Sequence, residues 1–522
     1  LQYYKPSSNV GKGKILLDPF MGSGVVVGEA LRLGYKVIGV DINPVAWFMV
    51  KKEIEPVDLE TLDAAFKDLE RRVAPSIMSM YATKCASCRR GAYVKYVFWA
   101  KTITCERCKE PIILYEEPVL ARHALNKRVR VFFCPHCGYV FKHDSGGEYD
   151  KGERTITCPE CDSKIKVNDG TATRVKYTCP VCHFRGRIID AVRKQGGPPS
   201  HVMLGLEYIC DKCGVEFKSP DENDRDLYER ICRKFKQDFD KLLIPREPIP
   251  DGYNTRQILN YGYRYWYELF NERQLLALSS LLRGILELED ENIKEFFLLL
   301  FSGILEFNSM LCSSKGLGTG GVRHAFAHHA FIPPKNPLEA NVWGIKGSSG
   351  GFSTLYYLRL RKAKLYCINP VERVVRSHGS RLKTIRLVKI KERIEGWLAD
   401  TFQELITNSG KNIMLLCKSS HRLDEIPDRS VDIIVTDPPY PGNVMYSELS
   451  NYFYVWLKIA LKEKYACFRR PLINDSDEIR GDPRGEYEEY MYGMYRVFRA
   501  VSYTHLRAHE TEADLVCRLL LE

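Results

Sequence analysis

Four residues in the C-terminal part of the chain, Asp437-Pro438-Pro439-Tyr440, carry the groups needed to hold a planar amine. The Asp437 carboxylate and the Pro438 carbonyl can each accept one N–H, and Tyr440 can stack on an aromatic ring. Two acceptors would hold the exocyclic amine of a nucleobase, whose lone pair is otherwise delocalised into the ring, so that its nitrogen faces an electrophile. The alternative for this tetrapeptide alone is an ordinary strand-to-loop turn with a buried tyrosine.

The run before this motif, Val431–Thr436, is short, β-branched and apolar, which is typical of a buried strand in a parallel sheet. The two prolines after it stop the strand and stiffen the turn. Ligands of open α/β sheets bind at the carboxyl ends of the strands. The motif therefore lies where such a sheet binds its ligand.

A second stretch, near the start of the chain, has the pattern of a nucleotide-binding unit. Residues 14–17 are strand-like, residues 18–24 (Asp-Pro-Phe-Met-Gly-Ser-Gly) form a glycine turn, and residues 25–33 follow with a helical pattern. A second strand, residues 36–40, ends in Asp41, which is placed to bind both hydroxyls of a ribose. Because no third glycine follows, a nucleoside-type ligand is favoured over a pyrophosphate. S-adenosylmethionine (SAM) fits, with its ribose on Asp41 and its methionine portion over the turn between Gly22 and Gly24.

The segments LLDPFMGSG, VIGVDINP and VDIIVTDPPY together resemble the SAM-dependent amino-methyltransferases that modify adenine N6 or cytosine N4 in DNA. A third strand is expected at residues 413–417, followed by Ser419 where many members of that family have an aspartate near the cofactor adenine. The aromatic residues of the helix that follows the motif, Tyr452, Phe453, Tyr454 and Trp456, are expected in the core rather than under a base. The resemblance implies cofactor contacts from Asp18, Phe20, Gly22, Ser23, Gly24, Asp41 and Ser419. It also implies a catalytic site that holds the target nucleobase, made of Asp437, Pro438, Pro439 and Tyr440.

Twelve of the 18 cysteines fall in six C-x-x-C pairs, a pattern that indicates metal binding in a reducing compartment such as the cytoplasm. Within consecutive couples of pairs the intervals are 16, 20 and 27 residues. This spacing predicts three four-cysteine zinc ribbons in series over residues 84–218, and each zinc would be structural because four thiolates leave no open position. Redox-active pairs are the alternative. The predicted ligands are Cys85, Cys88, Cys105, Cys108, Cys134, Cys137, Cys158, Cys161, Cys179, Cys182, Cys210 and Cys213.

The formal charge of +11 invites a nucleic-acid partner, and residues 84–218 hold 24 basic and 15 acidic residues. Because four thiolates around Zn²⁺ carry a net charge of about −2, three such sites leave this stretch only mildly basic. The ribbons are either a clamp for nucleic acid or for a partner, or a rigid spacer with a solvated basic face. The clamp would use Arg122, Lys127, Arg128, Arg130, Arg185, Arg187, Arg193 and Lys194.

The rest of the chain predicts helices over residues 221–312, where Arg264 and Arg273 could face a backbone phosphate. Residues 313–354 are glycine-rich and basic, and could contact phosphates through Arg323, His324, His328, His329 and Lys335. Residues 356–364 and 383–391 alternate apolar and basic side chains, which predicts half-exposed strands along a polyanion groove.

At 522 residues the chain should hold two or three domains. The expected fold class is α/β, with a Rossmann-like class I methyltransferase sheet split by a large insertion of zinc ribbons and helices. The cysteine pairs and the helical segment after them resemble a group of large prokaryotic adenine-specific DNA methylases that carry zinc ribbons inside the catalytic fold, and this resemblance runs up to about Ala500. The expected division is residues 1–60 and 401–500 for the catalytic domain, 84–218 for the ribbons, 221–312 for a helical insertion and 313–400 for possible target recognition.

Residues 501–522 are set apart as doubtful, because they resemble translated adapter sequence, and with Leu1 at the start we expect a fragment. No apolar run is long enough to span a bilayer, and nothing in the pattern sets an oligomeric state. The expected function is methyl transfer to DNA, at adenine N6 ahead of cytosine N4. Two alternatives stay open, an RNA base amino-methyltransferase acting for instance on guanine N2 of tRNA, and a non-catalytic zinc-ribbon adaptor that binds nucleic acid.

Overall fold

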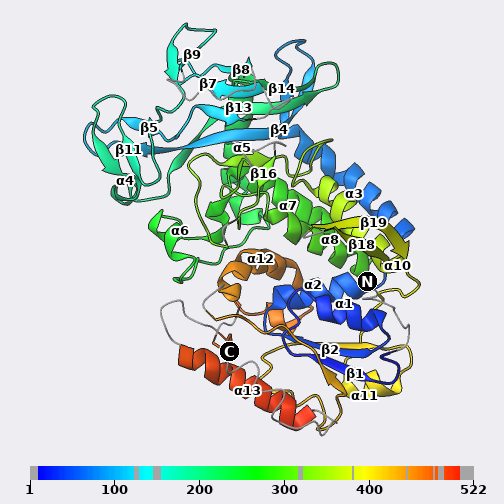
Figure 1. Ribbon diagram of the computed structural model, residues 1–522. Helices are drawn as coiled ribbons and strands as arrows, with labels where there is room; N and C mark the ends of the chain where they lie inside the picture. Colours follow the sequence, from blue (N-terminus) through cyan, green and yellow to red (C-terminus); the bar gives the residue numbers. More distant parts are fainter. Residues whose placement is uncertain are drawn as a thin grey trace. The chain divides into compact units, whose positions relative to one another are not determined.

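The computed structural model (Figure 1) describes residues 10–122, 129–144, 155–314, 321–327, 329–378, 381–441, 445–473, 476–479 and 487–505. The protein is of mixed α/β class and divides into two compact units. Unit 1 comprises Leu1–Leu62, Arg359–Tyr454 and Leu461–Glu522, and unit 2 comprises Asp63–Leu358 and Val455–Ala460.

Unit 1 is built on a four-stranded sheet with the order β20-β2-β1-β21, in which every neighbouring pair is parallel. The sequence predicted the strands β1 (Ile15–Asp18), β2 (Lys36–Asp41) and β20 (Ile413–Cys417). The predicted strand at residues 431–436 is shorter, since β21 covers Ile433–Ile434. The chain runs outward from β1 through β2 to β20 and then returns to β21 on the other side of β1. Open α/β sheets bind ligands at such a reversal.

Helices cover both faces of this sheet (Figure 1). On one face, alternate residues of β1 and β2 pack with α11 (Phe402–Thr407) and α13 (Tyr487–His505). On the other face lies α1 (Val25–Arg32), whose Val27 side chain would be 3.3 Å from a Cβ built at Gly39 of β2. The helix α2 (Pro44–Ile54) packs beside β2 and β20. Because both faces are covered, the interiors of these strands are apolar.

The helix that follows the DPPY motif, α12 (Tyr446–Leu461), confirms the prediction of core packing for its aromatic residues. Tyr452, Tyr454 and Trp456 are fully buried, and Phe453 is partly buried. Residues 495–498 lie within α13. The tail from residue 506 onward lies outside the described residues.

Unit 2 contains a six-stranded sheet with the order β14-β13-β4-β17, to which β3 and β5 are added by pairing with β4. Its central pair is antiparallel and long, with β4 (Gly91–Thr104) against β13 (Ser200–Cys210). The shorter members are β3 (Ala82–Lys84), β5 (Pro111–Ile113), β14 (Gly214–Lys218) and β17 (Leu338–Ala340).

Within the described residues, unit 2 also contains four small antiparallel sheets. Three lie in the cysteine-rich part, namely β6 (Val119–Ala121) with β7 (Val129–Phe133) and β8 (Val140–Asp144), β9 (Thr155–Thr157) with β10 (Lys164–Lys166), and β11 (Lys176–Thr178) with β12 (Arg185–Arg187). The fourth is β15 (Ser313–Ser314) with β16 (Val322–Arg323).

The helical stretch predicted over residues 221–312 is present. It contains α5 (Glu222–Asp238), α6 (Arg256–Asn260), α7 (Glu272–Leu286) and α8 (Glu291–Leu305), with 3₁₀ turns η1 (Phe239–Lys241) and η2 (Trp266–Leu269). The other helical segments are α3 (Leu59–Ser79), α4 (Ile188–Gln195), α9 (Phe352–Leu355) and η4 (Ala466–Phe468). In the part of the chain that the structure describes, no helix combines the length and apolar character needed to cross a membrane.

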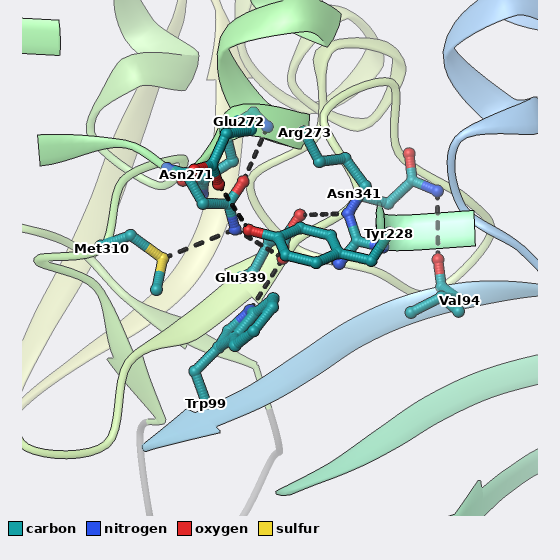
Figure 2. Close-up of polar contacts among 10 residues, drawn as sticks. Val94, Trp99, Tyr228, Asn271, Glu272, Arg273, Met310, Glu339 and Asn341 are labelled. Carbon is teal, nitrogen blue, oxygen red and sulfur yellow. Dashed lines mark hydrogen bonds and ion pairs between the residues drawn. The ribbon is translucent and has the colours of Figure 1, made fainter. Parts of the chain in front are cut away.

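A buried polar network joins the sheet of unit 2 to its helices (Figure 2). Arg273 of α7 donates to both carboxylate oxygens of Glu339 on β17, at 2.7 and 2.8 Å. Trp99 of β4 and Asn271 donate to the same carboxylate at 2.8 and 2.9 Å. The prediction that Arg273 faces a phosphate is therefore wrong, because its guanidinium is enclosed and neutralised within the protein.

Of the two half-exposed strands predicted at residues 356–364 and 383–391, the first is wrong. Residues 356–364 lie in the π-helical turn η3 (Tyr356–Leu360) and in α10 (Arg361–Ile368). The buried side chains there are Tyr356, Leu360 and Lys364, spaced by four residues, which is a helical repeat. The other prediction, residues 383–391, corresponds to β19 (Arg381–Lys389), which pairs with β18 (Val371–His378).

Candidate active site and cysteine clusters

The glycine turn after β1 is fixed by backbone geometry and by contacts with β2. Gly22 and Gly24 have φ angles of 47° and 78°, in the left-handed region that favours glycine. A Cβ at Gly24 would also lie 2.8 Å from a Val50 methyl group. The Met21 N–H donates to the Val40 carbonyl at 3.0 Å, and the Gly22 N–H donates to Asp41 Oδ2 at 2.9 Å. The turn therefore lies against the end of β2.

Asp41 holds the turn as well as facing the cavity beside it. Its Oδ1 accepts the Asn43 N–H at 2.8 Å, while Oδ2 accepts that of Gly22. Burial raises the pKa of Asp41 to about 6, although these two hydrogen bonds lower it. At neutral pH the group is ionised, and each oxygen keeps a lone pair for a ligand hydroxyl.

Asp18 joins the two halves of the site. It is 1% exposed, and its Oδ1 accepts from the Thr436 hydroxyl at 2.8 Å and from the Phe20 N–H at 3.2 Å. Burial raises its pKa to about 6, and the Asp41 and Asp437 carboxylates add to that shift. Because Thr436 directly precedes the DPPY motif, this hydrogen bond holds the ends of β1 and β21 together.

The Asp437–Tyr440 motif lies at the carboxyl edge of the sheet. The Tyr440 hydroxyl donates to Asp437 Oδ1 at 2.9 Å, and the side chain is 60% exposed, so the buried-tyrosine alternative is wrong. The Tyr490 hydroxyl donates to the Pro439 carbonyl at 2.8 Å. Among the described residues, no donor reaches the Pro438 carbonyl. The Pro438 carbonyl is thus available to accept a hydrogen bond.

A cavity of about 480 Å³ brings the predicted residues together. Gly24 faces Val50 and does not line it. Ten of the eleven predicted cofactor and catalytic residues line it, namely Asp18, Phe20, Gly22, Ser23, Asp41, Ser419, Asp437, Pro438, Pro439 and Tyr440.

Ser419 also borders a second, smaller cavity of about 250 Å³, which Ile42, Cys417 and Cys467 line as well. Its Oγ lies 3.0 Å from His421 Nδ1.

Sequence reasoning missed three residues at this site. Asp477 and Glu478 line the cavity, and Glu478 accepts from the backbone N–H of Ser447 at 2.9 Å and from its hydroxyl. Tyr490 fixes Pro439 from α13. The only available signal was the acidic run Asp475–Glu478, which resembles no motif and lies far from the DPPY segment in sequence.

The lining is strongly acidic. Asp18, Asp41, Asp437, Asp477 and Glu478 face one basic residue, Lys418, which is paired with Glu425 at 2.8 Å. Such a cavity attracts a cation and repels a polyanion.

The cysteines form three groups of four, but not in series as predicted. The groups are Cys85, Cys88, Cys210 and Cys213, then Cys105, Cys108, Cys179 and Cys182, then Cys134, Cys137, Cys158 and Cys161. Only the last joins consecutive pairs. The reason is β4, which separates Cys88 from Cys105 by 14 extended residues, or about 45 Å. Its antiparallel partner β13 returns Cys210 to the start of β4.

Each group has the geometry of a zinc site. Sulfur–sulfur distances of 3.5 to 3.7 Å between pairs match the edge of about 3.8 Å expected for a tetrahedron with Zn–S bonds of about 2.3 Å. A disulfide would need about 2.05 Å. The residue after each second cysteine has a positive φ, whether glycine (Gly138, Gly214) or not (Arg89, Lys109, Asp162, His183). All six turns are therefore of one type.

Of the eight basic residues expected to help the ribbons bind, six are described. Arg122 pairs with Glu117 at 2.7 Å, and Arg130 is buried. Lys127 and Arg128 lie outside the described residues, as does His328 of the glycine-rich segment. The four that are exposed, Arg185, Arg187, Arg193 and Lys194, come from β12 and α4.

Comparison with known proteins finds similarity over short stretches of the chain. The Type II methyltransferase M.MvaI of Kocuria varians is 46% identical over 57 residues, which is 11% of this chain and 13% of that protein. M.BsoBI of Geobacillus stearothermophilus is 42% identical over 62 residues, 12% of each chain, and M.MjaII of Methanocaldococcus jannaschii is 32% identical over 57 residues, 11% of each. The chain thus spans about an eighth of the length of these relatives.

No solved structure matches the chain. Residues 5–52 match the N6/N4 methyltransferase family, which is described as DNA methylase. This match contains the glycine turn and Asp41, and it identifies the N-terminal segment as similar to N6/N4 DNA amino-methyltransferases.

Proposed function

We propose that the protein is a SAM-dependent methyltransferase that acts on the exocyclic amine of a base in DNA, adenine N6 ahead of cytosine N4. One observation carries the proposal. A single cavity joins the glycine turn and Asp41, which lie in the segment similar to DNA methylases, to the Asp437–Tyr440 motif. The strand order β20-β2-β1-β21 supports a Rossmann-like class I sheet, interrupted between β2 and β20 by the inserted cysteine-rich and helical segments.

The charge of the cavity favours SAM over other nucleotides. SAM carries a sulfonium and an ammonium group against one carboxylate, so it is a net cation, whereas dinucleotides and ATP are polyanions. The five acidic side chains of the lining complement the cation. Asp41 would accept the ribose hydroxyls, and the turn around Gly22 would lie under the methionine portion.

The chemistry assigned to this chain is alignment and charge stabilisation. Bound SAM supplies an electrophilic methyl group. The Asp437 carboxylate and the Pro438 carbonyl would accept the two amine N–H groups, holding the nitrogen toward the methyl and stabilising the positive charge that grows on it. As the nitrogen–methyl bond forms, the sulfonium–methyl bond would break to leave a neutral thioether, and the amine proton hydrogen-bonded to Asp437 would pass to that carboxylate. The Tyr440 hydroxyl, which donates to Asp437 here, must release it so that the ring can stack on the base. In duplex DNA the base must also be extruded, at a cost of roughly a few kcal/mol.

We further propose that each cysteine group holds one structural Zn²⁺. The tetrahedral sulfur spacing and the six matching turns support this. A protein with three thiolate sites is expected in a reducing compartment, which for a DNA methylase is the cytoplasm.

The test is calorimetric titration of the zinc-loaded protein with SAM, followed by transfer of labelled methyl groups to duplex DNA and to tRNA. We expect SAM binding and labelling of DNA, and product analysis then distinguishes N6-methyladenine from N4-methylcytosine. Labelling of tRNA alone would show an RNA enzyme. A folded, zinc-loaded protein that binds nucleic acid but neither binds SAM nor transfers methyl groups would be an adaptor, and either result would overturn the proposal.

A further inference from the structure

The three cysteine modules differ in charge. The second module, residues 105–113 and 171–196, holds eight basic and three acidic residues. The first module, residues 82–92 and 207–218, holds five basic and three acidic residues. The third module, residues 129–144 and 155–167, holds four basic and three acidic residues. Subtracting about 2 for a zinc tetrathiolate leaves net charges of about +3, 0 and −1. By this count the second module is the most basic of the three when metallated.

The positive charge of the second module is concentrated on one face of the ribbon formed by β11 and β12. Lys176 pairs with Arg187 and Thr178 pairs with Arg185 across the two strands, so these four side chains share a face. The opposite face carries Tyr177, which is buried in the module core beside the cysteines. Lys176, Arg185 and Arg187 are all exposed.

These cations have little to neutralise them. Within the described part of the chain, no acidic side chain lies within ion-pair distance of Lys176 or Arg185, and Arg187 reaches Asp190 only at 3.9 Å. Like charges directly opposite each other on a ribbon, such as Lys176 and Arg187, destabilise it. The repulsion between these like charges therefore opposes folding slightly, and a bound polyanion would reduce this repulsion.

We propose that the β11–β12 ribbon binds duplex DNA, with Arg185, Arg187 and Lys176 on the phosphates that border the major groove. The groove of B-DNA is about 12 Å wide and admits a two-stranded ribbon, whereas that of an RNA duplex is too narrow and deep. The arginine fork matches phosphate oxygens. This proposal rests on the proposed function, because it takes DNA as the substrate. It assigns the contact with the DNA backbone to the β11–β12 ribbon.

The ribbon β9–β10 supplies a matched control. Lys164 and Lys166 on β10 are exposed, are two residues apart as Arg185 and Arg187 are, and share their face with Thr157 and Thr155. The variants Arg185→Gln/Arg187→Gln and Lys164→Gln/Lys166→Gln thus each remove two charges from equivalent positions. The full-length, zinc-loaded protein and both variants would be titrated with a fluorescent 30-base-pair DNA duplex at several salt concentrations, and with the matching RNA duplex.

We expect the arginine variant to bind DNA at least tenfold more weakly, and the slope of log K against log salt to fall by about 2. The lysine variant should stay within about threefold of the parent, and the RNA duplex should bind more weakly than DNA. Equal losses in both variants, an unchanged arginine variant, or a preference for RNA would each overturn the proposal. If the glutamines cost the protein a zinc ion, the single variant Lys176→Gln, on the other strand, should still lower the slope by about 1.

Calorimetry with SAM on the same samples separates this proposal from the proposed function. If the arginine variant binds SAM like the parent but binds DNA weakly, the result supports the DNA-binding role proposed for the β11–β12 ribbon. A parent that fails to bind SAM contradicts the proposed function, while the DNA titrations still decide the role of the ribbon.

Discussion

We expect the proposed base site to depend on Asp437, because its carboxylate lines the cavity and, among the described residues, accepts a hydrogen bond from the Tyr440 hydroxyl. We expect Asp437→Ala to lower methyl transfer by at least about 100-fold, since an acceptor for the reacting amine is lost. SAM binding should stay within about threefold, because the cofactor contacts lie at Asp41 and the glycine turn. Single-turnover transfer and calorimetry measure the two quantities. Loss of SAM binding in this variant would contradict the role assigned to Asp437.

Asp41 gives the site a pH dependence. Because burial raises its pKa from 3.8 to about 6, the folded protein holds this proton more tightly than the unfolded chain. Its contribution to folding stability therefore falls as pH rises from about 4 to about 6. We expect cofactor binding to have the opposite trend, since the ionised carboxylate would accept the ribose hydroxyls.

We expect SAM to bind roughly tenfold more weakly at pH 5 than at pH 8, as the charged hydrogen bonds are lost. Calorimetry across this range measures the effect. Asp18 titrates in the same range, so the variant Asp41→Asn provides the control. The Asp41→Asn variant should bind SAM weakly at every pH. If this variant kept the full pH dependence, Asp41 would be excluded as the source of that dependence.

At the residue scale, the sequence predicted those side chains that follow a recognisable strand and turn, such as Asp41 and Asp437. It could not find Glu478, which lines the cavity, or Tyr490, which donates to the Pro439 carbonyl, because both lie in segments with no motif of their own. Nor could it show that Asp18 bonds Thr436, since that contact depends on the pairing of β1 with β21.

At the scale of elements, the cysteine turns were predictable and their pairing was not. Spacing within each C-x-x-C pair is local, and so is the left-handed residue that follows it. Which pairs meet depends on β4, whose length was not evident from the sequence, and on its antiparallel register with β13. The same limitation explains residues 356–364, where an alternating pattern concealed a helical repeat.

Zinc content of double variants tests the nested pairing directly. Cys85→Ser/Cys210→Ser alters one group in this structure and should lose about one zinc ion per chain. Cys85→Ser/Cys105→Ser alters two groups and should lose about two. Pairing in series predicts the reverse order. Atomic absorption on purified, reduced protein measures the content, and equal losses in the two variants would contradict both arrangements.

At the scale of the whole molecule, the chain builds unit 1 from segments on either side of Asp63–Leu358 and builds unit 2 mostly from that intervening stretch. The three strands β1, β2 and β20 could be predicted because each is a buried, apolar run. The helices of residues 221–312 could also be predicted from their periodicity. The six-stranded sheet could not, since its pairing of β4 with β13 and β17 joins segments whose contacts leave no local pattern.

The stability of unit 2 is expected to depend on the buried Arg273–Glu339 pair, whose side chains are 4% and 0% exposed. Burial alone lowers the pKa of Arg273, but the Glu339 carboxylate more than compensates, so the guanidinium stays charged. Glu339→Gln would leave that charge buried without its counter-ion and should destabilise unit 2 by about 3–5 kcal/mol. The matched control is Glu287→Gln, which breaks an exposed pair with Arg72 and should cost less than about 1 kcal/mol. Urea unfolding followed by zinc release compares the two, and equal midpoints would show that the network in Figure 2 contributes nothing beyond a surface ion pair.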